Sequence, residues 1–373
     1  MKVENSTRAF GCPLKYIQGP GEFSNIAAFC RPYGEKAFFL IDGFLFENMQ
    51  MRLHGSFADS DQSFMAQCFG GECCQEEIDR VAQEVERFGA NILVGVGGGK
   101  TCDTVKLVSD REAMPRILVP TSASSDAPCT EVAILYSPEG EHLKSIRLRQ
   151  NSEIILVDTE IIIQAPARLF YAGMADALAT WFEAQACNLS DSANRVGQTG
   201  YRRCLAGLEI AKLAYEVILR DGQRAKLALE AGAITEAFEN VVEANTLLSG
   251  VGFMNTGTAA AHGIHSGLTV LPCTHPYLHG EKVAFGIICQ LVLENAPDAE
   301  VERIVRFLIS LDLPVTLGQL NVEVTPENIR AIAHKTAALN PLVHAEPFRV
   351  TEDMVYSAIL AANAIGATYL AAN

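Results

Sequence analysis

The feature of this sequence that most constrains its fold is the alternation of short apolar runs with helical stretches over roughly its first 160 residues. Such alternation is typical of parallel βαβ units. We therefore predict an α/β domain with a Rossmann-like parallel sheet, in which residues 138–141 turn a hairpin. The strand-like runs are residues 36–42, 91–96, 116–120 and 153–158, and the intervening helical patterns are residues 76–88 and 101–108.

The patterning changes after Pro166. The rest of the chain is rich in Ala, Leu and Glu at helical spacing, and long strand-like runs are missing. A length of 373 residues also favours about two domains. We predict an α/β domain at residues 1–164 and an all-α domain at residues 165–373, with helices at residues 205–220, 224–248, 283–294, 299–311 and 354–371.

Charge and cysteine usage exclude several classes of protein. The formal charge is −15, and the longest basic cluster (Lys144, Arg147, Arg149) is too thin for a nucleic-acid footprint. The N-terminal stretch lacks the cationic head and apolar core of a signal peptide, and no apolar run approaches a membrane span. The eleven cysteines form no CxxC pair, which favours reduced thiols. We expect a soluble cytoplasmic protein that binds neither nucleic acid nor membrane.

A glycine-rich turn, residues 95–101, lies between a predicted strand and a predicted helix. Glycines let a backbone approach a phosphate, and a helix N-terminus supplies free N–H groups. Val94 occupies the position where a P-loop requires glycine, and Lys100 the position of the third glycine of a dinucleotide fingerprint. The turn is therefore a phosphate cradle of a third kind or a purely structural turn.

Two further segments follow predicted strands. Asp42 ends an early strand, where a carboxylate can bind a ribose and repel a 2′-phosphate, favouring NAD over NADP; it can also simply form a turn. Residues 120–128 place hydroxyls and Asp126 between two prolines at the carboxyl edge of the sheet, where doubly wound folds bind ligands. A loop that caps the next helix is the alternative interpretation.

Four of the eight histidines (His262, His265, His275 and His279) fall within eighteen positions. His262 and His265 share one face of a helix. Asp176, among small residues, offers a carboxylate as a further ligand. Two imidazoles and one carboxylate leave coordination open for a substrate, as a catalytic Zn²⁺ or Fe²⁺ site requires. Spacing alone leaves open which histidines are ligands.

Taken in order along nearly the whole chain, these motifs resemble the glycerol dehydrogenases of the iron-containing alcohol dehydrogenase superfamily. The motifs are residues 15–19, 69–73, 97–106, 125–129, 172–184 and 279–286. The resemblance implies that Asp176, His262 and His279 bind a divalent metal. It also implies an NAD site lined by Asp42, Gly98, Gly99, Lys100, Asp103, Thr121, Ser124, Thr130, Val132 and Tyr136.

The resemblance further assigns the binding of substrate hydroxyls to Asp126. From the expected mechanism we also place Asp176 and His262 at the substrate and predict that Asp126 and His265 are catalytic residues. His265 and His275 are candidates for a proton relay, with ordinary packing in the pocket wall as the alternative. Thr180 stands where related iron enzymes carry a further histidine ligand, which favours Zn²⁺, with Fe²⁺ as the second choice. Departures from the family pattern at Glu131, residues 256–258 and residues 343–349 leave the preferred polyol open.

We therefore predict NAD-dependent oxidation of glycerol, or a related vicinal diol, to the hydroxyketone, in a homo-oligomeric enzyme. The first alternative is a lyase that uses NAD and zinc in the manner of dehydroquinate synthase, although Asp126 is poorly suited to a phosphate monoester. The second is a dehydrogenase of the same family acting on another small alcohol or hydroxy acid. Val94 disfavours a P-loop ATPase, and the complete ligand set disfavours a binding module without catalysis.

Overall fold

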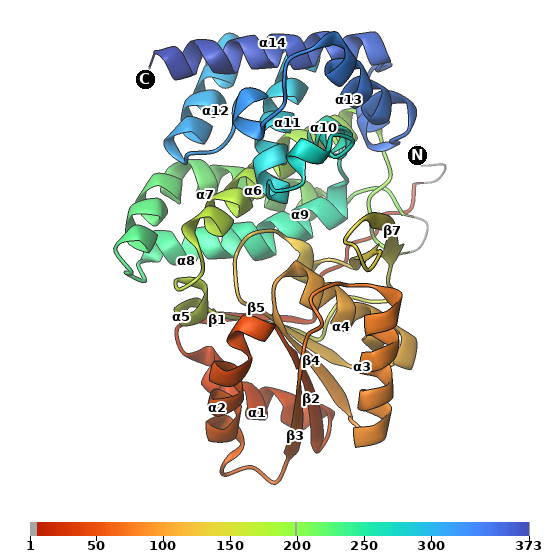
Figure 1. Ribbon diagram of the computed structural model, residues 1–373, viewed down its shortest axis with the longest axis vertical. Helices are drawn as coiled ribbons and strands as arrows, with labels where there is room; N and C mark the ends of the chain where they lie inside the picture. The colour runs from red at the N-terminus through yellow and green to blue at the C-terminus, as the bar shows by residue number, and fades with distance from the viewer. Residues whose placement is uncertain (1–5, 198–199, 373) are drawn as a thin grey trace.

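The computed structural model describes residues 6–197 and 200–372 and shows a sheet domain and a helical domain stacked along the long axis (Figure 1). Residues 1–5 lie outside the described residues. They belong to the N-terminal stretch that we compared with signal peptides. The last strand of the sheet ends at Asp158, and the first long helix of the second half begins at Ala167. The predicted fold class, an α/β domain followed by helices, is confirmed.

The sheet has six parallel strands in the order β1-β8-β5-β4-β2-β3. Alternate side chains of β2 enter two separate cores: Phe38 packs with the helices α3 and α4, and Phe39 packs with α1 and α2. Because helices cover both faces of the sheet, the strands inside it appear in the sequence as continuous apolar runs. Their bounds are β1 Lys15–Gly19, β2 Lys36–Ile41, β3 Ser63–Cys68, β4 Ile92–Gly97, β5 Arg116–Pro120 and β8 Ile154–Asp158; the helices are α1 Ile26–Cys30, α2 Phe46–Phe57, α3 Gln75–Phe88 and α4 Gly99–Glu112.

Strands β1 and β3 are the two edge strands, and both escaped the sequence prediction. An edge strand is half exposed, so β3 mixes polar and apolar residues and carries no continuous apolar run. The strand of residues 153–158, expected to be last, is last in the sequence but lies inside the sheet, between β1 and β5.

The strand order reverses between β2 and β4. From β2 the chain crosses to β3 on one side, and it then returns to β4 and continues through β5 to β8 on the other. In doubly wound sheets, ligands bind in the crevice at the carboxyl ends of the strands where the order reverses. In this sheet Asp42 follows β2 and Gly98 follows β4, so the topology places both at that crevice.

The predicted hairpin is confirmed. Strands β6 (Val132–Tyr136) and β7 (His142–Arg147) pair antiparallel, apart from the parallel sheet. The fully buried Lys106 of α4 donates to the carbonyl of Val132 (2.9 Å) and to that of Ala127. A buried ammonium requires such acceptors, so this contact anchors the hairpin and the preceding loop to α4.

The helical domain begins with α6 and contains no strand within residues 167–197 and 200–372. The predicted division into helices at 205–220 and 224–248 is wrong, because α7 runs unbroken through residues 221–223. Asp221 is buried there and accepts hydrogen bonds from Arg220, Arg224 and Asn240, which offsets the poor helix propensity of Asp-Gly. The helices are α6 Ala167–Ser190, α7 Leu205–Glu230, α8 Glu236–Glu243, α9 Ser249–Thr256, α10 Ala260–Leu268, α11 His279–Leu293, α12 Asp298–Ser310, α13 Pro326–Ala338 and α14 Glu352–Ala371.

The true interruption lies at residues 231–235, where Gly232 is left-handed (φ 64°). A π-helical turn, Ala244–Leu248, then separates α8 from α9. Within this turn Asn245 donates to the carbonyl of Ala123 (2.9 Å) in the loop after β5 and to that of Phe170 (3.1 Å) in α6. One side chain thereby joins the two domains.

Helix α14 requires a correction to the expectation that no segment approaches a membrane span. The helix is long and apolar enough to cross a membrane by length and composition alone. One such helix is weak evidence, because a core helix passes the same test. In this fold α14 buries Val355, Ala358 and Ile359 in the helical domain and packs against α11 and α13.

We predict that Gly173→Ala destabilises the protein. A Cβ atom at Gly173 would lie 2.0 Å from the carbonyl oxygen of Ala123, so helix α6 would be forced away from the loop that carries Asp126. Overpacking of this kind costs about 1–3 kcal/mol. Urea unfolding followed by circular dichroism measures the loss.

The matched control is Gly55→Ala in α2, where a Cβ would meet nothing within 4 Å. Alanine is favoured over glycine within a helix by about 0.5–1 kcal/mol, so this variant should be more stable than the wild type. Equal stability of the two variants would contradict the close approach of α6 to the loop.

Candidate metal centre and cofactor cleft

Three side chains from separate helices of the second domain meet at one point. Asp176 Oδ1 lies 3.3 Å from His262 Nε2 and 3.2 Å from His279 Nε2, and the two imidazole nitrogens are 3.2 Å apart. Asp176 comes from α6, His262 from α10 and His279 from the first turn of α11. Gly280 permits this arrangement, because a Cβ there would lie 1.9 Å from the carbonyl oxygen of Ala172 in α6.

This triangle of donor atoms fits a divalent metal. A tetrahedral Zn²⁺ with bonds of about 2.0–2.1 Å separates its ligand atoms by about 3.3 Å, which matches all three edges. Asp176 Oδ2 is buried without a hydrogen-bond partner, although buried carboxylate oxygens normally have one. Three protein ligands leave the fourth position for a substrate, as in catalytic zinc sites.

The electrostatics of the triangle also favour a cation. Burial alone would raise the pKa of Asp176, but His279 and His262 outweigh it and hold this pKa well below its usual range. Burial alone would lower the pKa of His262, but Glu183 and Asp176 outweigh it and raise this pKa well above its usual range. A site that holds a proton on His262 so strongly is also suited to hold a metal ion in its place.

Each of the two imidazoles has a second partner at Nδ1. His262 Nδ1 lies 2.6 Å from Glu183 Oε2, and His279 Nδ1 lies 3.1 Å from His265 Nε2. Burial, His279 and Lys282 hold the pKa of His265 well below its usual range, so His265 is neutral. His265 therefore lies beside His279, whereas His275 is exposed and, within the described part of the chain, its ring hydrogen-bonds to the carbonyl of Thr269 (3.2 Å).

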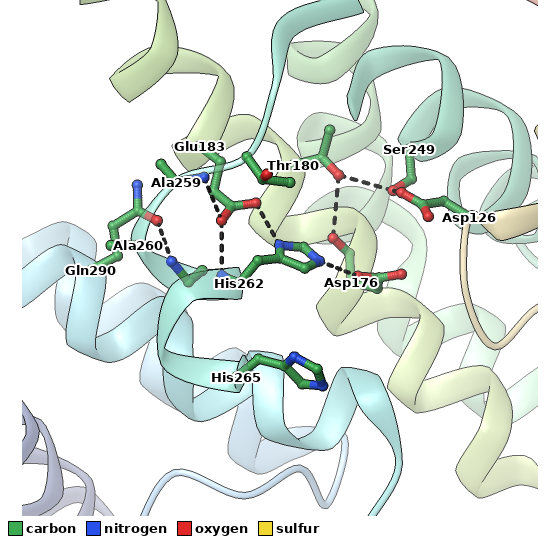
Figure 2. A network of polar contacts seen from close by, with 12 residues as sticks. Asp126, Asp176, Thr180, Glu183, Ser249, Ala259, Ala260, His262, His265 and Gln290 are labelled. Carbon is green, nitrogen blue, oxygen red and sulfur yellow. Dashed lines mark hydrogen bonds and ion pairs between the residues drawn. The ribbon is translucent and has the colours of Figure 1, made fainter. Parts of the chain in front are cut away.

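Asp126 reaches the same site from the loop after β5. Ser249 Oγ donates to Asp126 Oδ2 (3.0 Å), and Thr180 Oγ1 lies 2.9 Å from Ser249 Oγ (Figure 2). Thr180 also donates to the carbonyl of Asp176 (3.3 Å), so Asp126 is tied to the helix of the metal ligand across the domain boundary. Desolvation and the neighbouring Asp176 carboxylate raise the pKa of Asp126 to about 7.

The expected cofactor residues form a second cluster at the crevice of the sheet. Asp42 accepts a hydrogen bond from the N–H of Gly98 (2.8 Å) and another from the hydroxyl of Thr101. Gly98 is the N-cap residue of α4, and Gly99 and Lys100 form its first turn. Asp42 is therefore hydrogen-bonded to the glycine-rich turn that we predicted as a candidate phosphate-binding turn.

Lys100 projects across this crevice. Its ammonium pairs with Glu72, from the loop after β3, and lies 5.1 Å from the ring centre of Tyr136. Tyr136 ends strand β6, so the hairpin contributes one wall of the crevice. Glu72 escaped the sequence prediction as a functional residue, although it lies within the quoted motif of residues 69–73.

The remaining expected cofactor residues lie around the same loop and hairpin. Asp103 is buried, and its two oxygens bind Lys106 Nζ (3.3 Å) and the N–H of Ile134 (3.0 Å), which makes it an internal support of the hairpin in this structure. Thr130 Oγ1 donates to the carbonyl of Ala127 (3.0 Å), beside Val132. Thr121 and Ser124 lie in the loop after β5, where Ser124 Oγ is 3.1 Å from Ser122 Oγ.

The structure adds two residues to the metal centre that the sequence analysis did not single out, Glu183 and Ser249. Glu183 lies seven positions after Asp176, two helical turns further on the same face of α6, and this spacing was the available signal. Ser249 carried no comparable signal, because only the π-helical turn before it brings it to Asp126.

Comparison with known proteins agrees with this geometry. Residues 13–159 match the family of iron-containing alcohol dehydrogenases. The chain is 42% identical to a glycerol dehydrogenase of Escherichia coli over 97% of this chain and 98% of that one, and 40% identical to a glycolaldehyde reductase of Halobacterium salinarum over 96% and 98%. A crystal structure of a probable glycerol dehydrogenase from Sinorhizobium meliloti superposes with a TM-score of 0.90 at 44% identity, covering 97% of this chain and 99% of that one.

Full-length identity at this level shows the family, and the chain belongs to the iron-containing alcohol dehydrogenases. It is a metal-containing alcohol dehydrogenase, and several of its full-length relatives at about 40% identity are named glycerol dehydrogenases.

We predict that Zn²⁺ stabilises the chelator-treated protein and that His279→Ala abolishes the effect. A ligand at a hundred times its Kd stabilises a folded protein by about 2.7 kcal/mol, which raises the thermal unfolding midpoint measurably. Removal of His279 leaves only two of the three donor atoms that face one another.

The control is His275→Ala, since this exposed imidazole hydrogen-bonds to a backbone carbonyl and lies outside the three-residue cluster. This variant should keep the full stabilisation by Zn²⁺. Stabilisation of the His279→Ala protein to the same extent as the wild type would show that the ion binds elsewhere.

Proposed function

We propose that this protein is an NAD-dependent glycerol dehydrogenase that oxidises glycerol, or a closely related vicinal diol, to the hydroxyketone. The observation that carries the proposal is the half-buried carboxylate of Asp126, which is tied to the open metal triangle through Ser249 and Thr180. This arrangement suits a polyol, because one hydroxyl of the substrate can bind the metal while another hydroxyl binds the Asp126 carboxyl group.

We assign Asp176, His262 and His279 as the metal ligands, with Zn²⁺ as the preferred ion and Fe²⁺ as the alternative. The bound cation would lower the pKa of the substrate hydroxyl, and so would promote its ionisation without a strong protein base. The ligands come from three helices that meet at the domain boundary, so the reacting carbon would lie between the two domains.

Asp126 binds a second hydroxyl of the substrate in this proposal. A carboxyl group whose pKa is raised to about 7 is present in both forms near neutral pH, so it can accept or donate a hydrogen bond to a neutral hydroxyl. The ionised form would repel a phosphate ester, which argues against phosphorylated polyols and against a lyase that binds a phosphate monoester.

NAD would lie across the crevice at the strand-order reversal and supply the hydride acceptor. Asp42 would bind the adenosine ribose, and the first turn of α4 at Gly98, Gly99 and Lys100 would face the pyrophosphate. Lys100 would exchange Glu72 for phosphate oxygens. Thr121, Ser124, Thr130, Val132 and Tyr136 would line the remaining length of the cofactor, with Asp103 supporting that wall from within.

We place the protein in the cytoplasm as a homo-oligomer. All eleven cysteines lie in the described part of the chain and are free thiols, as a reducing compartment favours. The domain boundary at residues 164 and 165, His265 as a catalytic residue, and the absence of nucleic-acid and membrane partners stay predictions.

The decisive assay follows NADH absorbance with NAD and glycerol. We expect turnover that is lost in the presence of a chelator and restored by Zn²⁺. Ethylene glycol serves as the comparison substrate, because its oxidation product is glycolaldehyde, the compound named in one full-length relative. A higher kcat/KM for ethylene glycol than for glycerol would show that the two-carbon diol is the preferred substrate. Activity with glycerol 1-phosphate would contradict the proposed role of Asp126.

Asp126→Asn tests the substrate assignment. A hydrogen bond to a charged group contributes about 1.5–3 kcal/mol, so kcat/KM for glycerol should fall about 10- to 100-fold. The loss should be measured at saturating NAD and Zn²⁺. Asp353→Asn, at an exposed carboxylate on α14, is the control and should match the wild type. An unchanged KM and kcat in Asp126→Asn would remove Asp126 from the site.

A further inference from the structure

Glu183 is a completely buried carboxylate that lies against the metal triangle without being one of its ligands. Its Oε1 accepts hydrogen bonds from the N–H groups of Ala259 and His262, both at 2.9 Å. Its Oε2 lies 2.6 Å from Nδ1 of the His262 ring (Figure 2). One carboxylate therefore holds both the main chain and the side chain of the same residue.

This contact determines which nitrogen of His262 faces the metal position. A carboxylate accepts hydrogen bonds, so Nδ1 carries the proton and donates it to Glu183. When a metal ion replaces the second proton of the ring, the lone pair is on Nε2, the atom that lies 3.3 Å from Asp176 Oδ1. The hydrogen bond also restricts rotation of the ring, because the carboxylate is itself fixed by the two N–H groups.

The other histidine of the triangle has a different partner. His279 Nδ1 lies 3.1 Å from Nε2 of the His265 imidazole, whereas His262 Nδ1 faces a carboxylate. A carboxylate that accepts a hydrogen bond from Nδ1 raises the electron density at Nε2, which makes Nε2 a stronger metal ligand. The two imidazoles are thus unequal donors, and Glu183 is the cause.

We propose that Glu183 is a positioning residue that orients His262 and strengthens its binding to the divalent cation. The inference rests on the metal assignment within the proposed function. It predicts a weaker metal site when the carboxylate is replaced, even where the protein remains folded.

The alternative is that Glu183 only caps a helix. The N-terminus of α10 has three side-chain acceptors: Glu183, Glu346 on the N–H of Ala260 (3.1 Å) and Gln290 on the N–H of Ala261 (2.9 Å). Glu346 is also almost completely buried, but its hydrogen bond to this helix is to a backbone N–H group. Glu346 is therefore a matched control for the capping role.

The experiment compares Glu183→Gln with Glu346→Gln. Both changes keep an oxygen for the backbone N–H groups and replace one buried carboxyl group with an amide. Only Glu183→Gln can place an amide donor against the Nδ1–H of His262. Zn²⁺ affinity is measured on the metal-free proteins by competition with a chromophoric chelator, and the absorption spectrum of the Co²⁺-loaded proteins reports ligand geometry.

We expect Glu183→Gln to bind Zn²⁺ about 10- to 100-fold more weakly than the wild type, as is typical when an outer partner of a metal ligand is lost. The Co²⁺ spectrum should change with it. Glu346→Gln should keep the wild-type affinity and spectrum. Glu183→Asp, which retains the charge on a shorter side chain, should bind with intermediate affinity and serves if the glutamine variant does not fold.

Wild-type affinity in Glu183→Gln would overturn the inference, and so would equal weakening in both glutamine variants, because the effect would then come from capping. Failure of the metal assignment itself is distinguishable. In that case the wild type would show no Zn²⁺ affinity that depends on His279, whatever the Glu183 variants do.

Discussion

The structure depends on the burial of one carboxylate, Asp176, between two imidazoles. Its side chain is only 1% exposed, and no lysine or arginine forms an ion pair with it among the described residues. An ionised group in such a position is costly unless opposite charge compensates it. His262, whose pKa is raised well above its usual range, supplies that charge as a proton, and a divalent metal would supply it more completely. The second domain is arranged around this requirement.

Three helices must approach closely to meet it, and small residues permit the approach. Gly280, directly after His279, lets α11 rest on the backbone of α6, just before Asp176. Glu183 then fastens α10 to α6 through two backbone N–H groups as well as the imidazole. The hydrogen bonds that build the helical domain and those that hold the metal ligands are therefore partly the same.

The two domains meet through polar contacts that converge on the site. Asn245, in the π-helical turn, joins the loop after β5 to α6, and Ser249 holds the Asp126 carboxylate beside the metal triangle. π-Helical turns are rare and are frequently found at functional sites. Here the extra residue in the turn sets the direction of two side chains that contact the other domain.

Local sequence was sufficient for the fold class, the hairpin, the crevice turn and the set of candidate metal ligands. Apolar periodicity is a local property, and so is the spacing of His262 and His265 on one helical face. The half-exposed edge strands β1 and β3 lacked a clear pattern, and the Asp-Gly pair in α7 lost its helix-breaking effect only because Asp221 found three partners in space.

Residue type and spacing could not decide which imidazoles meet Asp176, since His262, His265, His275 and His279 are equivalent in type and close in sequence. The family resemblance named His262 and His279, and the tertiary structure brings these two to Asp176. It placed His265 beside the triangle and His275 outside it. It also directed Asp103 to the N–H of Ile134, Lys100 to Glu72 and Glu183 to His262. The physical reason is the same in each case: a charge selects its partner by distance and burial, and both are set by how distant segments pack.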